Sequence, residues 1–102
     1  MRNKPKALSR DEAERKIKQI LAQGIVELSY HCLKQSMTLR DVEMEDIVAV
    51  LGNGQIIREP EWEERYQNWK YRVEGLDISN DVLTAITVIF EAQMSLYIVT
   101  VY

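Results

Sequence analysis

Hydrophobic residues recur at helical spacing in the first half of the chain. Ser9-Arg10-Asp11-Glu12 has the spacing of a capping box, which predicts a helix that begins after Ser9. One apolar stripe follows along that helix: Ala13, Ile17, Ile20 and Leu21. Gly24 is placed to end the helix in the left-handed conformation.

The next segments predict a short strand and two further helices. Ile25–Leu28 reads as the strand, and Ser29 is a candidate N-cap for a helix over about residues 30–37, which we expect to loosen at Ser36–Leu39. A second apolar stripe predicts a helix over about residues 43–51: Met44, Ile47, Val48 and Leu51. The glycines of Gly52-Asn53-Gly54 then predict a stop and a tight turn.

From residue 52 onward the period of the pattern changes to that of strands. Gln55–Glu59 predicts a strand stopped by Pro60, and residues 61–65 predict a polar turn or short helix. Residues 69–75 alternate, with Tyr71 on one face and Arg72 on the other. Residues 77–81 have turn chemistry, and two β-branched runs, 82–90 and 96–102, flank a loop of hairpin size.

Such closely spaced strands predict an antiparallel meander. We therefore expect an α+β fold, with N-terminal helices packed on one face of a three- to four-stranded antiparallel sheet. The 102 residues fit one domain. Within it we expect a flexible basic arm at 1–8, a mainly helical part at 9–51 and the antiparallel sheet at 52–102.

Composition narrows the class of protein further. Hydrophobic residues make up 46% of the chain and charged residues 28%, which is typical of a globular domain. No apolar run approaches the roughly 20 residues of a membrane span, so we expect no membrane association. The basic start of the chain is followed by a polar helix instead of the apolar core of a signal peptide. With one cysteine and one histidine, the sequence favours a cytoplasmic protein without disulfide, metal or cofactor.

The net charge of −3 is unevenly distributed. Residues 1–23 carry seven basic and three acidic side chains, a net charge of +4, and the remainder carries −7. The basic segment is either a solvated helix face behind a frayed tail or a surface for phosphates or an acidic partner. The isoelectric point of about 5.2 argues against nucleic acid as the main ligand.

Residue chemistry alone offers few catalytic arrangements. His31 and Cys32 are adjacent, so on a helix they point about 100° apart and do not form a nucleophile–base pair. No phosphate-binding glycine loop, nucleophile elbow or metal-ligand spacing occurs. Acidic groups such as Glu61, Glu63 and Glu64 are interpreted as solvated turn residues.

The order of several short motifs resembles a known family. These motifs are Ser29-Tyr30-His31, Arg40–Ile47, Gly52-Asn53-Gly54, Tyr71–Gly75 and Ile98–Tyr102. Over residues 25–102 they resemble DUF4258, a domain-of-unknown-function family of small bacterial proteins related to the RelE-like toxin fold. Gln35 stands where the family pattern has an arginine, and Arg40 matches a second family arginine if one residue is inserted in Ser36–Leu39.

The resemblance implies a toxin of a toxin–antitoxin pair with RelE-like architecture, a metal-independent endoribonuclease acting on mRNA beside a small antitoxin protein. Such cleavage needs a base, a cation for the phosphorane charge and an acid for the leaving oxygen. His31 is the natural base or acid, because its ordinary pKa lies near neutrality. Arg40 or Arg72 is the candidate cation, and Tyr71 or Tyr102 is the candidate orienting or protonating group.

Each candidate residue also has a structural interpretation. His31 fits a helix residue bonded to backbone, and the arginines fit ion pairs with acids such as Glu59 or Glu74. The tyrosines and tryptophans fit core or rim packing.

A second function class stays open beside the ribonuclease. Gln35 and the acidic isoelectric point favour a catalytically inactive protein-binding or regulatory module on the same fold. The β-branched Val99-Thr100-Val101 run offers a sheet edge for a partner chain or for a homodimer. The fold and the placement of His31 favour the ribonuclease.

Overall fold

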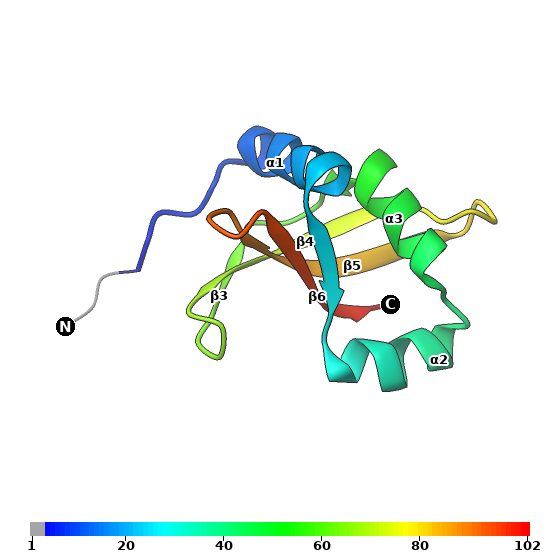
Figure 1. Cartoon of the computed structure of the whole chain (residues 1–102). Helices are drawn as coiled ribbons and strands as arrows, with labels where there is room; N and C mark the ends of the chain where they lie inside the picture. Colours follow the sequence, from blue (N-terminus) through cyan, green and yellow to red (C-terminus); the bar gives the residue numbers. More distant parts are fainter. Residues whose placement is uncertain (1–3) are drawn as a thin grey trace.

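Helices lie on one side of a strongly twisted mixed sheet in the computed structural model, which describes residues 4–102 (Figure 1). The described elements are α1 (Arg10–Gln23), β1 (Ile25–Leu28), the π-helical segment η1 (Cys32–Ser36), α2 (Met37–Arg40), α3 (Met44–Asn53), β2 (Gln55–Ile56), β3 (Glu61–Glu63), β4 (Asn68–Leu76), β5 (Val82–Phe90) and β6 (Ser95–Val101). The α+β class is confirmed. No helix among residues 4–102 combines the length and the apolar character that crossing a membrane requires.

Helix α1 forms as its capping box predicts. The Ser9 hydroxyl accepts from the Glu12 N–H at 3.2 Å, and the Glu12 carboxylate accepts from the Ser9 N–H at 3.0 Å. The prediction for Gly24 is wrong, because its φ of −119° lies outside the left-handed region. Space is what requires glycine here, since a Cβ would collide with the carbonyl oxygen of Met94. That oxygen accepts from the Ile25 N–H at 3.0 Å and so starts the pairing of β1.

The second helix is longer than predicted. Its N-cap is confirmed, because the Ser29 hydroxyl accepts from the Cys32 N–H at 2.9 Å. The expected loosening at Ser36–Leu39 is wrong, since the chain stays helical through η1 and α2 to Arg40. Buried Cys32, Ser36 and Met37 hold this segment against the core, and Asp41 ends it at a left-handed φ of 54°.

The sheet is larger than the expected three or four antiparallel strands. Its order is β1-β6-β5-β4-β2, with β3 also paired to β4. The antiparallel β4-β5-β6 meander is confirmed, but β1 adds in parallel to β6. Glu61–Glu63 is a strand instead of a turn or short helix, because Trp62 lies opposite Trp69 on β4 and packs against it. The strand predicted over Gln55–Glu59 pairs only at Gln55–Ile56, and its chain then leaves the ladder before Pro60.

Serines cover the edge of β6 that the sequence suggests for chain pairing. Beyond the end of β1, the Ser29 hydroxyl donates to the Val99 carbonyl at 2.7 Å, and the Ser36 hydroxyl accepts from the Val101 N–H at 3.4 Å. Strand β1 is therefore the outermost strand on this side of the sheet.

The core lies between α1, α3 and the sheet face that they cover (Figure 1). Side chains alternate along β4, so Tyr71 and Val73 enter this core while Lys70 and Arg72 stand on the opposite face. We call that opposite side the open face. The first three residues of the predicted basic arm lie outside the described residues, and residues 4–8 run along the sheet towards α1.

Candidate functional site

The open face brings together two of the candidate residues and one acid. Arg72 on β4 donates through Nη1 to the Tyr102 hydroxyl and through Nη2 to Glu61 Oε1 on β3 at 3.1 Å. The guanidinium carbon also lies 5.9 Å from the centre of the Tyr102 ring. We call Arg72, Tyr102 and Glu61 the arginine triad.

Strand pairing explains why these three side chains meet. The backbone of Tyr102 is hydrogen-bonded to Thr84, so its side chain stands on the same face as that of Thr84, one strand away from β4. Glu61 pairs with Lys70, which puts its carboxylate diagonally across from Arg72. The triad thus brings residues from three separate segments together on one face of the sheet.

The triad holds its arginine in the charged form. Burial works to lower the pKa of Arg72, but the hydrogen bonds with Glu61 and Tyr102 outweigh it, so the pKa lies above its ordinary value. The Arg72 side chain is 23% exposed and that of Glu61 56% exposed, so solvent reaches the pair. An ion pair this exposed contributes little to stability, about 0–1 kcal/mol.

A second ion pair repeats the same diagonal geometry beside the triad. Lys70 donates to Glu63 Oε1 at 3.1 Å, and the Glu63 pKa is lowered by its hydrogen bonds from the Arg65 N–H and from Lys70. Further along this face, the Tyr66 and Tyr97 rings pack edge to face at 5.0 Å. The open face therefore carries two cations, two carboxylates and an aromatic cluster.

Tyr71 lies on the other side of the sheet from the triad. Its side chain is buried on the helix-covered face, where its hydroxyl accepts from the Leu8 N–H at 2.9 Å. Burial raises the pKa of Tyr71, and the hydrogen bond from Leu8 works in the opposite direction. The structure therefore gives Tyr71 a packing environment, separate from that of Arg72 and Tyr102.

His31 and Arg40 lie on the segment between β1 and α3. His31 is exposed in the first turn after the Ser29 cap, and no hydrogen bond within residues 4–102 joins it to the triad. Arg40 is also exposed and donates to the Val82 carbonyl at the start of β5, at 3.4 Å. Neither side chain contributes a hydrogen bond to the triad as it stands here.

Sequence reasoning missed Glu61 as a site residue. Glu61 and Glu63 were interpreted as solvated turn residues, and the ion pairs of Arg72 were expected with Glu59 or Glu74. The signal that reveals them is the alternation in Glu61-Trp62-Glu63, which fits a strand with Trp62 on one face and both acids on the other. Among the described side chains, no group of three or more His, Cys, Asp or Glu residues is arranged to hold a metal ion.

Comparison with known families shows one match. The model of the family described as "Domain of unknown function (DUF4258)" matches residues 28–102. The chain belongs to the DUF4258 family. The DUF4258 match begins at the last residue of β1, so α1 precedes it, and the whole triad falls inside it together with His31 and Arg40. No curated protein and no solved structure matches the chain.

The DUF4258 region thus presents a cation that is hydrogen-bonded both to a hydroxyl and to a carboxylate. A guanidinium binds phosphate through two parallel hydrogen bonds, a phenol can donate a proton, and a carboxylate can accept one. These are the groups that a phosphodiester transfer without a metal requires.

Proposed function

We propose that this DUF4258 protein is a metal-independent endoribonuclease acting on mRNA, a toxin of a toxin–antitoxin module with the RelE-like architecture. The observation that supports the proposal is the meeting of Arg72, Tyr102 and Glu61 on the open face. Two of these residues are site candidates from the sequence, and the third supplies the carboxylate.

The proposed reaction uses the ribose 2′-hydroxyl as the nucleophile. Glu61 takes the proton of this hydroxyl, and the 2′ oxygen attacks phosphorus while the bond from phosphorus to the 5′ oxygen breaks. Tyr102 gives its proton to the departing 5′ oxygen, and Arg72 stabilises the charge on the phosphorane. The products are a 2′,3′-cyclic phosphate and a 5′-hydroxyl, and the proton on Glu61 returns to Tyr102 through solvent.

The triad can open to admit a phosphate. Glu61 occupies one edge of the Arg72 guanidinium, which has five N–H donors in total. Replacing an exposed carboxylate partner by a phosphate costs about 1 kcal/mol or less. A bound phosphate therefore competes with Glu61 for Arg72 and frees the carboxylate to act as a base.

The test is cleavage of a long mRNA by purified protein in the presence of a chelator, with and without ribosomes. We expect products with cyclic phosphate ends, and a loss of about 100-fold or more in rate for Arg72→Ala. Tyr102→Phe and Glu61→Gln should lose about 100-fold each, since each removes one proton-transfer group. Arg65→Ala is the matched control, because Arg65 is exposed and stacks over Tyr66 outside the triad.

His31→Ala and Arg40→Ala decide between the triad and the two helix-borne candidates. Unchanged cleavage by both variants supports the triad as proposed. Cleavage that is lost in His31→Ala but intact in Arg72→Ala contradicts it and moves the reaction to the helix after β1. Absence of cleavage and of growth arrest on expression contradicts the ribonuclease altogether.

A binding or regulatory module is the second candidate function, and the position of β1 favours it. As the outermost strand, β1 can accept a strand from an antitoxin protein or from a second copy of the chain. Its residue Ile25 is 59% exposed, so the side chain is accessible to such a partner. If this is the function, size-exclusion chromatography should show a complex with the antitoxin protein or a dimer, and Ile25→Lys should abolish it. The wild-type protein should then cleave no RNA.

A further inference from the structure

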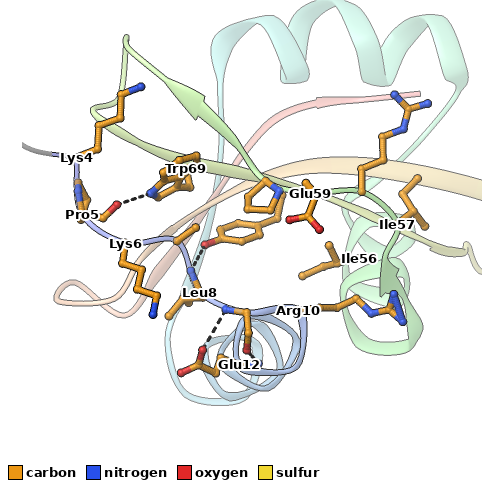
Figure 2. A pocket seen from close by; sticks show the side chains of 15 residues that line it. Lys4, Pro5, Lys6, Leu8, Arg10, Glu12, Ile56, Ile57, Glu59 and Trp69 are labelled. Carbon is orange, nitrogen blue, oxygen red and sulfur yellow. Dashed lines mark hydrogen bonds between the residues drawn. The ribbon is translucent and has the colours of Figure 1, made fainter.

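A groove of about 920 Å³ lies between the start of the chain and the link from β2 to β3 (Figure 2). Figure 2 shows residues Lys4 to Leu8 along one side of this groove and Ile56, Ile57 and Glu59 along the other. The volume is at the upper end of the roughly 300–1,000 Å³ that small-ligand sites occupy. It lies apart from the triad, on the helix-covered side of β4.

Two hydrogen bonds fix the first side of the groove. The Trp69 indole N–H donates to the Pro5 carbonyl at 2.7 Å, and the Leu8 N–H donates to the Tyr71 hydroxyl at 2.9 Å (Figure 2). The two β4 residues in these hydrogen bonds, Trp69 and Tyr71, also line the groove. Residues 4–8 thus form a defined wall, in which the Pro5 carbonyl and the Leu8 N–H bond to β4 and neither Lys4 nor Lys6 forms an ion pair.

The groove is electropositive on an acidic protein. Four cations line it: Lys4, Lys6, Arg10 and Arg58. Within residues 4–102 none of the four forms an ion pair, and the only carboxylates in the lining are Glu12 and Glu59. Glu12 is already engaged by the Ser9 N–H in the capping box. The groove therefore has a charge of about +2 where the whole chain has −3.

The apolar part of the lining includes two aromatic side chains. These are Trp69 and Tyr71. The Trp62 ring packs edge to face on Trp69, with 5.4 Å between the ring centres, and Lys4 Nζ lies 5.4 Å from the centre of the Trp62 ring. Cations beside aromatic rings are the combination by which proteins bind single-stranded nucleic acid, since phosphates pair with the cations and bases stack on the rings.

The groove is also connected in the chain to the triad. Arg58, Glu59 and Pro60 line it, and the next residue, Glu61, is the carboxylate bonded to Arg72. Tyr71 faces the groove and its neighbour Arg72 faces the open side, so the two sites lie on opposite sides of the same sheet edge. A single-stranded nucleic acid that passes over residues 57–61 would reach both the groove and the triad.

We infer that this groove binds single-stranded RNA as an extension of the triad, an inference that rests on the proposed ribonuclease function. Phosphates of the strand pair with Lys6, Arg10 and Arg58, and a base stacks beside Trp69. The basic start of the chain then serves to hold the substrate of an otherwise acidic protein.

The test separates binding from cleavage by using a fluorescent RNA oligonucleotide with 2′-O-methyl groups, which has no nucleophile. For the wild-type protein, the logarithm of the binding constant should fall with the logarithm of salt concentration at a slope of up to about −2.1, since each of the three neutralised phosphates contributes about −0.7. The double variant Lys6→Ala/Arg58→Ala should weaken binding about tenfold and reduce the slope by about 1.4.

Two further variants control for net charge and for folding. Lys18→Ala/Lys34→Ala removes two exposed cations outside the groove and should leave the slope unchanged. Glu59→Gln removes an anion from the lining, so it should tighten binding severalfold, a change that a misfolded protein does not produce.

Three results overturn the inference. One is equal weakening by both double variants, which means that only total charge matters. Another is no tightening by Glu59→Gln. The third is tighter binding of an acidic peptide of the same charge than of the oligonucleotide, which assigns the groove to a protein partner. Cleavage of unmodified RNA is measured separately, so failure of the groove and failure of the triad are distinguishable.

Discussion

Two glycines in one short segment should respond in opposite ways to the same substitution. Gly52 lies inside α3, and a Cβ added there would meet only the Leu21 Cδ2 atom, at 3.6 Å, which is an ordinary contact. Gly54 follows the helix, and a Cβ there would lie 2.5 Å from the Val50 carbonyl oxygen and 2.8 Å from both the Glu74 oxygen and Val73 Cγ1. Its φ of −83° is ordinary, so the obstacle is space alone.

The two effects can be given magnitudes. Alanine is better than glycine in a helix by about 0.5–1 kcal/mol, so Gly52→Ala should raise the free energy of unfolding by up to about that amount. At Gly54 two of the three colliding atoms belong to the backbone and cannot rotate away. Overpacking of this kind costs about 1–3 kcal/mol. The two variants should therefore differ by about 1.5–4 kcal/mol, and the larger part of that difference is the collision at Gly54 in the folded state.

Thermal unfolding followed by circular dichroism measures this difference. For a domain of this size 1 kcal/mol shifts Tm by about 4–8 °C, so Gly52→Ala should melt a few degrees higher and Gly54→Ala about 4–24 °C lower than the wild type. Urea unfolding should show a shifted midpoint with an unchanged dependence of the unfolding free energy on urea concentration, which identifies both effects as changes in stability. A Gly54→Ala protein as stable as Gly52→Ala would instead show that α3 and β4 are not packed this closely.

Three further predictions concern buried polar groups. Ser29→Ala should lower the free energy of unfolding by about 1–3 kcal/mol in urea, because it removes the cap on the helix and the bond to the Val99 carbonyl, whereas Ser79→Ala in the exposed turn should change it little. Burial raises the pKa of Tyr71 above its ordinary 10.0, so the unfolded chain loses this proton first and stability should fall as pH rises above about 10. In Tyr71→Phe, the urea midpoint should fall less steeply with pH between about pH 8 and 11 than in the wild type, and an unchanged pH dependence would contradict the raised pKa of Tyr71. Cys32 is fully buried and its thiol pKa is raised by burial, so a thiol reagent should react with it only at the rate of unfolding, and fast labelling of the native protein would show that the segment after β1 is open.

The elements that the sequence predicts well depend on contacts between near neighbours. The capping box of α1 joins Ser9 to Glu12, three residues apart, and the stripe through Ile47 and Leu51 requires only the period of one helix. The β4-β5-β6 meander follows from short turns between consecutive strands. Arg72 and Tyr102 were named as candidates from the chemistry that the family resemblance implies together with their residue types.

The errors concern contacts between distant parts of the chain. Ile25–Leu28 reads correctly as a strand, but its parallel pairing with Ser95–Ile98 depends on how α1 packs on the sheet. The prediction for Gly24 was wrong for the same reason, since this position needs glycine because the carbonyl of Met94 leaves no room for a Cβ. The helix after Ser29 extends to Arg40 because its buried side chains meet the core.

The candidate site shows the same division. The sequence alone is enough to predict the α+β class, the N-caps at Ser9 and Ser29, the alternation that puts Tyr71 and Arg72 on opposite faces, and the excess of cations at the start of the chain. The meeting of Glu61 and Tyr102 with Arg72, and the groove that these cations line beside Trp69, depend on the folded arrangement of the strands. The physical reason is that periodicity records which face of an element is buried, whereas a partner on another strand is selected by the packing of the whole core.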